Sequence, residues 1–209
     1  MGVQLHKTSH LVLFLVILPV LSALLAWGVG QLIAEVVPSK LTFLVDSVGI
    51  LGAFGLLYKA FDLWAWRWRV FRLARVVEVP IVAGRWVGQL TSSQDGHSTT
   101  YDAALEIKQS FNRVAVAMYF ASSRSASVVA GFAEEPDGTL ALHYEYQNVP
   151  DVDAAATMHI HYGTAKVHCV PGETRLSGSY YNWGRDERGH VGTMRLDFES
   201  STLVHRLKK

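Results

Sequence analysis

The sequence predicts an all-β domain, folded as an antiparallel up-and-down barrel of about eight strands and preceded by a transmembrane hairpin of two helices. Three observations lead to this fold class. Apolar residues concentrate before Phe61, in two long runs separated by a short break. After Pro80 the hydrophobic period changes from helical to two, the alternation of a half-buried strand. Turn-forming residues then recur between the alternating stretches, which indicates short connections between strands.

Composition limits the class of protein. Half of the 209 residues are hydrophobic, 18% are charged, and the formal net charge is +1. No overall field therefore favours DNA or RNA as a partner. The single cysteine, Cys169, excludes an intrachain disulfide framework and suits a reducing compartment.

The first predicted helix spans residues 11–33, a stretch without any charged side chain. About 20 apolar residues, each rising about 1.5 Å, cross the roughly 30 Å hydrocarbon layer. The run is longer than the apolar core of a secretory signal peptide, and no small-residue cleavage site follows it. We therefore expect a transmembrane helix and not a cleaved signal.

The second predicted helix spans residues 41–61, with Asp46 and Lys59 near its ends, where both side chains can reach the interface. A buried core helix is the alternative. Tryptophans and clustered arginines after the helix favour a membrane interface on the cytoplasmic side. These residues are Trp64, Trp66, Trp68, Arg67, Arg69, Arg72 and Arg75. Lys40 is the only basic residue in the loop between the helices. We therefore expect residues 1–76 to form a multi-pass hairpin with both chain termini in the cytoplasm.

Three glycines recur every third residue in the second helix, at Gly49, Gly52 and Gly55. Small residues let helix backbones approach closely in lipid. We expect them to pack within the hairpin. The alternative is a face for self-association, to which Asp46 would also contribute.

Residues 77–199 are predicted to form the β domain. Strands are expected at residues 86–90, 102–109, 114–120, 128–132, 139–147, 158–170, 175–181 and 190–199. A β-sandwich is the competing architecture. Residues 200–209 form a basic tail, which we expect to be solvated, with contact to anionic lipid as the alternative.

Several inward-facing rows become polar or aromatic toward one end. Gln109 continues the inward row of its strand, and Tyr144, Tyr146 and Asn148 continue another. A stacking surface with a few hydrogen-bonding groups is how sites for small molecules are usually built. The alternative is that the tyrosines fill the barrel.

Residues 122–127 combine five small residues with Arg124 in a predicted turn, where Ser125 and the guanidinium would suit a phosphate. A polar hairpin turn is the alternative, and Arg185 lies in a second turn of the same ambiguity. His159 and His161 alternate on one side of a strand, but no third ligand for a metal is evident. No catalytic signature is found, so the sequence predicts a binding protein without a cofactor and not an enzyme.

Five local patterns follow the two predicted transmembrane helices. They are Gly84-Arg85-Trp86-Val87-Gly88, Ser122 to Ser127, Leu142-His143-Tyr144-Glu145-Tyr146-Gln147-Asn148-Val149-Pro150, His161-Tyr162-Gly163, and Leu176-Ser177-Gly178-Ser179-Tyr180-Tyr181 followed by Arg185, Gly189 and Arg195. With these patterns, the order of two transmembrane helices and a compact β domain resembles the two-transmembrane, β-strand-rich effector family of CBASS, a bacterial anti-phage signalling system. The resemblance covers nearly the whole chain, to about Phe198. The chain departs from the family pattern at Asn182-Trp183-Gly184, where a threonine and an acidic residue are expected.

The resemblance implies a barrel that binds a cyclic dinucleotide, oligomerises and disrupts the bacterial inner membrane, so that an infected cell dies by abortive infection. Tyr144, Tyr146 and Tyr181 would then stack on bases, although strand parity places Tyr181 opposite the inward row of its strand. The remaining candidates are Arg124 and Arg185 for phosphate, and Asn148, Gln109 and Ser125 for base edges.

Other functions stay open on the sequence alone. A membrane-tethered, lipocalin-like barrel would bind an apolar ligand and have an apolar lumen. A structural or assembly protein would have a filled barrel. A membrane-bound hydrolase would need an acid, base or nucleophile in the lumen, and no credible set is found.

Overall fold

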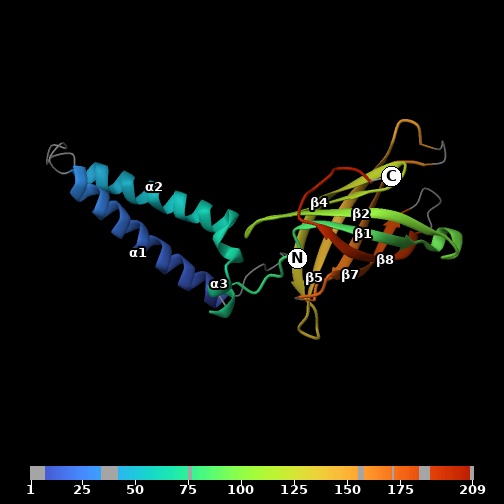
Figure 1. Ribbon diagram of the computed structural model, residues 1–209, viewed down its shortest axis with the longest axis horizontal. Helices are drawn as coiled ribbons and strands as arrows, with labels where there is room; N and C mark the ends of the chain where they lie inside the picture. Colours follow the sequence, from blue (N-terminus) through green and yellow to red (C-terminus); the bar gives the residue numbers. More distant parts are fainter. Residues whose placement is uncertain are drawn as a thin grey trace. The chain divides into compact units, whose positions relative to one another are not determined.

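The computed structural model describes residues 8–33, 42–74, 77–154, 158–170, 172–183 and 189–207. The chain divides into two compact units (Figure 1), of which one contains residues 6–78 and the other contains residues 79–209. The first unit is helical and the second is a β-barrel.

The helical unit contains α1 (Thr8–Ile33) and α2 (Thr42–Leu63), followed by the short helices η1 (Ala65–Arg67) and α3 (Arg69–Leu73). Helices are therefore present at both predicted runs. Among the side chains of α1 that are described, Leu18, Ser22 and Ala26 are buried. Their spacing of four places them on one face of the helix. The Ser22 hydroxyl donates to the Leu18 carbonyl at 2.6 Å, which satisfies it within the helix.

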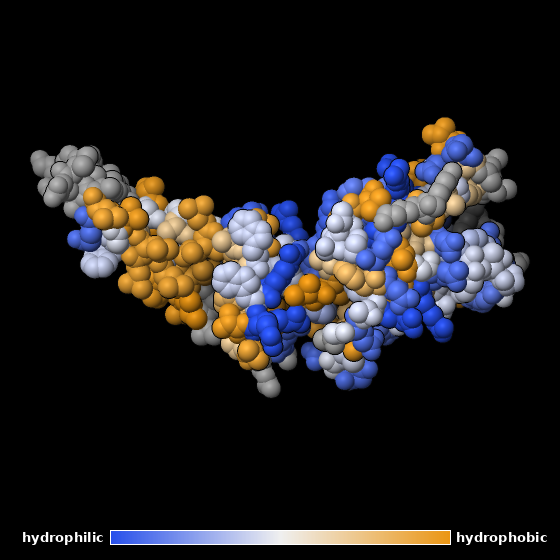
Figure 2. Space-filling model, in the orientation of Figure 1, coloured by the Kyte–Doolittle hydropathy of each residue, from blue (hydrophilic) through white to orange (hydrophobic). Residues whose placement is uncertain are grey.

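Most other described side chains of α1 are apolar and exposed, and Figure 2 shows apolar surface over this hairpin. Across the described part of the chain, no helix has both the length and the hydropathy of a membrane span.

The tryptophan segment differs from the predicted uniform belt. Trp64 and Trp68 are exposed, but Trp66 in η1 is fully buried, with the Arg67 guanidinium 5.3 Å from its ring centroid. The Trp66 ring therefore packs within the protein and is not exposed like the other two rings. The tight turn of the 3₁₀ helix rotates neighbouring side chains to different sides, which a composition pattern does not reveal.

Only one glycine of the predicted row faces α1. A Cβ atom at Gly49 would lie 3.6 Å from the Ala26 Cβ, whereas no atom lies within 4 Å of one at Gly52 or Gly55. Gly49 thus packs against α1 within the hairpin, and the other two glycines do not. Residues three apart fall about 60° short of a full turn at each step, so the row winds away from α1. The Asp46 side chain lies outside the described residues.

The second unit is a closed barrel in which each strand pairs antiparallel with the next and β1 pairs with β8. This confirms the up-and-down barrel and excludes the sandwich. The strands are β1 (Gly84–Thr91), β2 (Thr100–Gln109), β3 (Val114–Tyr119), β4 (Ser123–Glu134), β5 (Leu140–Pro150), β6 (His161–His168), β7 (Arg175–Trp183) and β8 (Gly189–Ser200). We call the end with the connections after β2, β4 and β6 the base, and the end with the connections after β1, β3 and β5 the mouth.

The core lies inside the barrel and is built from alternate residues of the strands. Trp86, Phe132, Leu142 and Leu196 are among its buried members. Burying each such side chain contributes roughly 1.5–3 kcal/mol. The Trp86 indole N–H also donates to the Val82 carbonyl at 3.0 Å, which satisfies its polar atom inside the apolar core.

The serine-rich segment is a strand and not the predicted turn. β4 begins at Ser123, where Ser123 and Ser125 are buried and Arg124 is exposed. A bulge follows Ser127, whose hydroxyl accepts a hydrogen bond from the Val116 N–H at 3.0 Å. Serine composition suggested a turn, but alternation between the two faces of the sheet decides the structure here.

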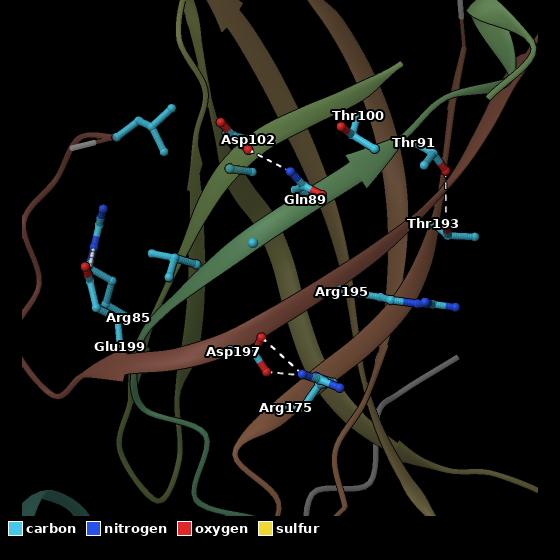
Figure 3. A pocket seen from close by; sticks show the side chains of 14 residues that line it. Arg85, Gln89, Thr91, Thr100, Asp102, Arg175, Thr193, Arg195, Asp197 and Glu199 are labelled. Atoms are coloured by element: carbon cyan, nitrogen blue, oxygen red, sulfur yellow. Dashed lines mark hydrogen bonds and ion pairs between the residues drawn. The ribbon is translucent and has the colours of Figure 1, made fainter. Parts of the chain in front are cut away.

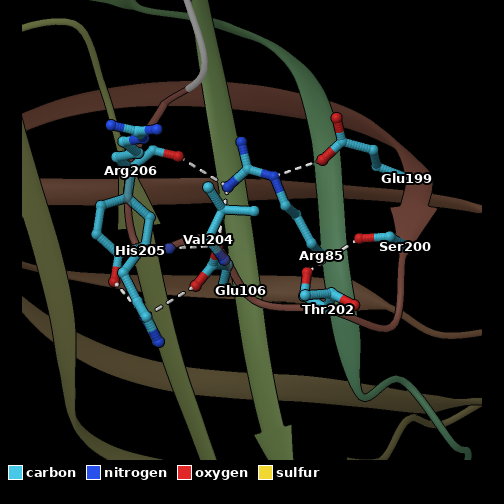
Figure 4. A network of polar contacts seen from close by, with 9 residues as sticks. Arg85, Glu106, Glu199, Ser200, Thr202, Val204, His205 and Arg206 are labelled. Atoms are coloured by element: carbon cyan, nitrogen blue, oxygen red, sulfur yellow. Dashed lines mark hydrogen bonds and ion pairs between the residues drawn. The ribbon is translucent and has the colours of Figure 1, made fainter.

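A buried ion pair lies on the outer wall near the base (Figure 4). The Arg85 guanidinium donates to a Glu106 carboxylate oxygen at 2.8 Å and to Glu199 at 2.5 Å. The side chains of Arg85 and Glu106 are only 1% and 2% exposed. Outward-facing charges on a barrel are normally solvated, so another segment must cover them.

The cover is the C-terminal segment. The backbone N–H groups of Val204 and His205 donate to Glu106 at 2.7 and 2.9 Å, and the Arg206 carbonyl accepts from Arg85 at 2.8 Å. Burial would raise the pKa of Glu106, but these N–H groups and Arg85 outweigh it, so that the pKa is lowered. The expectation of a simply solvated tail is therefore wrong for the backbone of residues 204–206.

Candidate functional site

The lumen near the mouth is lined by one continuous row of residues on five neighbouring strands. The strand register places these residues side by side, in the order Ser127, Tyr146, Gly163, Asn182 and His190 from β4 to β8. We call this set the Tyr146 row. Strand alternation directs all of its side chains inward, because Tyr146 belongs to the buried core. The row therefore crosses more than half of the barrel wall.

Tyrosine rings form the inner surface beside this row. Tyr144 and Tyr146 are buried, with ring centroids 6.0 Å apart and planes tilted by 50°. Tyr180 packs partly buried against the same core, and its hydroxyl donates to the Thr91 carbonyl at 3.0 Å. Burial raises the pKa of all three hydroxyls. At neutral pH they are therefore neutral hydrogen-bond donors on flat apolar rings.

Two glycines give these rings their space. A Cβ at Gly163 would lie 2.5 Å from the Tyr146 ring, and one at Gly192 would overlap the Tyr180 ring. Real Cβ atoms do not approach so closely, so any larger residue would displace a ring. The glycines are thus part of the shape of the lumen.

Polar groups at the mouth are left without partners from the protein. The Asn182 carbonyl oxygen Oδ1 is buried and accepts no hydrogen bond. Asn148 and Ser125 are 4% and 6% exposed and are paired in the sheet register. Within the described residues no hydrogen bond engages either side chain. A buried polar atom without a partner costs about 1–3 kcal/mol, so the Asn182 oxygen calls for an explanation in function.

Four of the predicted site residues come together in the lumen at the mouth: Tyr144, Tyr146, Asn148 and Ser125. Gln109 does not join them, because it lies at the base. Its amide donates to the Pro80 carbonyl at 2.8 Å, and its oxygen accepts from the Val82 N–H at 2.9 Å. Both ends of the amide are used to fix the chain that enters β1. Placing Gln109 with the amide groups of the pocket was therefore wrong.

Three other predicted residues do not line the lumen as described. Arg124 is exposed on the outer wall, paired in register with Tyr119. Tyr181 is 39% exposed and contacts Trp183, with ring centroids 6.4 Å apart. Both residues occupy outward positions in the alternation of their strands. Arg185 lies outside the described residues.

Sequence reasoning missed Asn182, Tyr180 and Gly163 as parts of the site. The signal was present, because Asn182 and Tyr180 share the parity of Leu176, which is buried. The sequence Asn182-Trp183-Gly184 was read as a turn, yet β7 continues to Trp183.

A concavity of about 930 Å³ lies on the outer wall of β1, β2, β7 and β8 (Figure 3). Its charged side chains pair largely with one another. Arg175 donates to Asp197 at 2.8 Å, and Gln89 donates to Asp102 at 3.2 Å. Charges of both signs and mutual pairing make this surface less suited to a flat anionic ligand than the lumen.

Other groups with possible chemistry are not assembled into a site. No group of three or more His, Cys, Asp or Glu side chains is placed to hold a metal, within the described ranges. His159 precedes β6, and the ring of His161 hydrogen bonds with the His159 carbonyl at 3.1 Å. Burial raises the pKa of the Cys169 thiol to about 11, so it is protonated at neutral pH.

Comparison with known proteins agrees with this geometry. A family model described as "Cap15, cyclic dinucleotide receptor domain" matches residues 77–197, which is more than half of the chain. The match spans β1 to most of β8 and includes every residue of the Tyr146 row. No curated protein matches the chain.

Proposed function

Because the chain belongs to the family of Cap15 cyclic dinucleotide receptor domains, we propose that the lumen at its mouth binds a cyclic dinucleotide. The observation that carries this proposal is the Tyr146 row, where buried tyrosine rings adjoin the Asn182 carboxamide oxygen, which accepts no hydrogen bond from the described protein. The barrel thus acts as the sensor of a CBASS effector, and its function is binding and not catalysis.

The chemistry of the ligand fits these groups. Nucleobases stack on aromatic faces, with about 1–3 kcal/mol for each base. The carboxamides of Asn148 and Asn182 offer donors and acceptors for base edges. The Ser125 hydroxyl and the hydroxyls of Tyr144 and Tyr146 are neutral donors for the phosphates. Arg185 remains a proposed phosphate ligand.

We propose further that the helical unit anchors the protein in the bacterial inner membrane, with both termini in the cytoplasm. The support is the charge-free sequence of residues 11–33, the exposed apolar side chains of α1 and the exposed rings of Trp64 and Trp68. Arginines follow the second helix, as on the cytoplasmic side of membrane proteins.

Ligand binding would drive oligomerisation, and the clustered hairpins would disrupt the membrane and cause abortive infection. A ligand shifts such an equilibrium only if it binds the assembly better than the monomer. Gly52 and Gly55 are exposed on α2 and offer a surface on which helices of other copies could approach closely. Asp46 would join this surface.

Calorimetric titration of the full chain in detergent with a panel of cyclic dinucleotides tests the sensor. We expect one member to bind at micromolar or lower concentration. Tyr146→Ala should abolish that binding because it removes a buried ring of the lumen. Tyr162→Ala is the matched control, because the Tyr162 ring is 61% exposed on the outer wall, and it should leave the binding unchanged. A folded chain that binds no member would contradict the proposal and bring the apolar-ligand barrel forward.

A further inference from the structure

We infer that Asn182 reads the base of the bound nucleotide and selects an edge that presents one donor beside one acceptor. The inference rests on the proposed cyclic dinucleotide site and names the residue that sets its specificity. Adenine presents such an edge at N6 and N7, and uracil at N3 and O4. Guanine presents one at N1 and O6, but its N2 donor lies beside N1, and that second donor is left without a partner by a single carboxamide.

The position of Asn182 follows from the register of the sheet. Gly163 pairs with Tyr146 on one side and with Asn182 on the other. Because Gly163 has no side chain, the Tyr146 ring lies directly over it, so close that a Cβ atom at this position would be 2.5 Å from the ring. A base that stacks on the Tyr146 ring would therefore turn its edge toward the Asn182 carboxamide on the next strand.

The Asn182 carboxamide is available for that edge. Its Oδ1 atom is buried and accepts no hydrogen bond from the described protein. By contrast, the inward carboxamide of Gln109 uses both of its ends for backbone groups at the base. Asn182 is thus an acceptor placed in the lumen without a structural partner, and a ligand N–H would complete it.

The charge pattern of the lumen favours the same class of base. A carboxamide pairs with adenine through its N6 donor and N7 acceptor, whereas guanine is usually read by arginine or lysine. The arginines and lysines of the eight strands all occupy outward positions in the alternation; they are Arg85, Lys108, Arg124, Lys166, Arg175 and Arg195. In the described strands, the mouth therefore offers amides, hydroxyls and the His190 imidazole to a base, and no arginine or lysine.

The test compares the affinities of the full chain for cyclic di-AMP, cyclic di-UMP and cyclic di-GMP. We expect the adenine or the uracil ligand to bind at least about tenfold more tightly than cyclic di-GMP. Asn182→Asp replaces the amide donor with a second acceptor at nearly the same size. It should reduce that preference by about tenfold or more, because the donor–acceptor match is lost.

Gln147→Glu is the matched control. It makes the same amide-to-acid change on β5, on the outer face, where Gln147 donates to the Tyr162 hydroxyl at 2.9 Å. It should leave the preference unchanged. Asn182→Ala is a second variant for the case in which Asn182→Asp does not fold, and its own folding is checked by its melting temperature. It should also reduce the preference over cyclic di-GMP.

The possible results separate the inference from the proposed function. Binding of no member of the full cyclic dinucleotide panel by the wild-type chain overturns both. Tight binding in which cyclic di-GMP is preferred, or a preference that persists in both Asn182 variants, overturns the inference alone. A preference that falls in the Asn182 variants and persists in Gln147→Glu supports it and names the base.

Discussion

The barrel buries polar side chains in two places, the outer wall near the base and the lumen at the mouth. On the outer wall, Arg85 donates to Glu106, to Glu199 and to the Arg206 carbonyl. Glu106 also accepts from the backbone of the C-terminal segment. At the mouth, the Asn182 oxygen has no partner, and Asn148 is buried without one among the described residues.

The two places therefore relate differently to stability. A buried charge that loses its partner is strongly destabilising, so the outer network fastens the end of the chain to the barrel wall. An unpaired buried amide destabilises the empty protein, and a hydrogen bond from a bound ligand offsets that cost. We expect substitutions in the outer network to change folding and those at the mouth to change binding.

The largest effect on stability should come from Glu106→Ala. It leaves the buried Arg85 guanidinium with one carboxylate fewer and removes the acceptor of two backbone N–H groups. Breaking a buried pair costs about 3–5 kcal/mol in free energy of unfolding. Urea unfolding followed by tryptophan fluorescence measures this loss.

Asp197→Ala is the control, because it breaks the exposed Arg175–Asp197 pair, whose side chains are 66% and 59% exposed. Such pairs contribute about 1 kcal/mol or less. Similar losses in free energy of unfolding for Glu106→Ala and Asp197→Ala would contradict the distinction between a buried charge with several partners and a solvated ion pair.

Gly163→Ala should have the next largest effect and should act at the mouth. The added methyl group would lie 2.5 Å from the Tyr146 ring and 2.6 Å from the Tyr181 carbonyl oxygen. Overpacking of this kind costs about 1–3 kcal/mol, and the displaced ring should also weaken nucleotide binding. Ala165→Gly is the control on the same strand. It removes a methyl group instead of adding one, so it should not displace the Tyr146 ring.

Acid should weaken the outer network. The pKa of Glu106 is lowered in the folded protein despite its burial, because Val204, His205 and Arg85 donate to it. Its stabilisation is therefore complete above the unfolded pKa of about 4.3 and is lost as the pH falls through the folded pKa. The free energy of unfolding should fall more steeply between about pH 5 and 3 in the wild type than in Glu106→Gln. Parallel pH curves would show that Glu106 is not the titrating group.

The smallest effect on stability should come from Asn148→Ala. Because no hydrogen bond engages the Asn148 side chain within the described residues, its removal breaks none, and the free energy of unfolding should change by less than about 1 kcal/mol. Nucleotide affinity should nevertheless fall about tenfold or more. A stability loss comparable to that of Glu106→Ala would show that Asn148 serves the fold.

The sequence allowed the fold and part of the site to be predicted because local periodicity reports both. Alternation along β2 and β5 identified inward rows, and that placed Tyr144, Tyr146 and Asn148 on the lumen side. Parity gives the face of a sheet but not the height along the barrel. Gln109 was misplaced for that reason. Counting strands would have corrected it, since the second and fifth strands of an up-and-down barrel run in opposite directions.

The outer network could not be predicted in the same way. Arg85 and Glu106 occupy outward positions, where charged residues are normally solvated. Their burial depends on residues 204–206, about a hundred positions away from either in the chain. No local pattern carries such a contact, and polar composition at the end of a sequence suggests a free tail.

Pairing of the first strand with the last also governs when the domain can form during translation. Arg85 on β1 and Glu199 on β8 are 114 residues apart, so β1 leaves the ribosome long before its closing partner exists. At about 5–20 residues per second, the unpaired edge of β1 persists for roughly 5–25 s in each new chain. Contacts of such high sequence separation slow folding. A ribosome that stalls before residue 189 leaves an open sheet that lacks the β8 side of the Tyr146 row, so a truncated chain should be unable to respond to the signal.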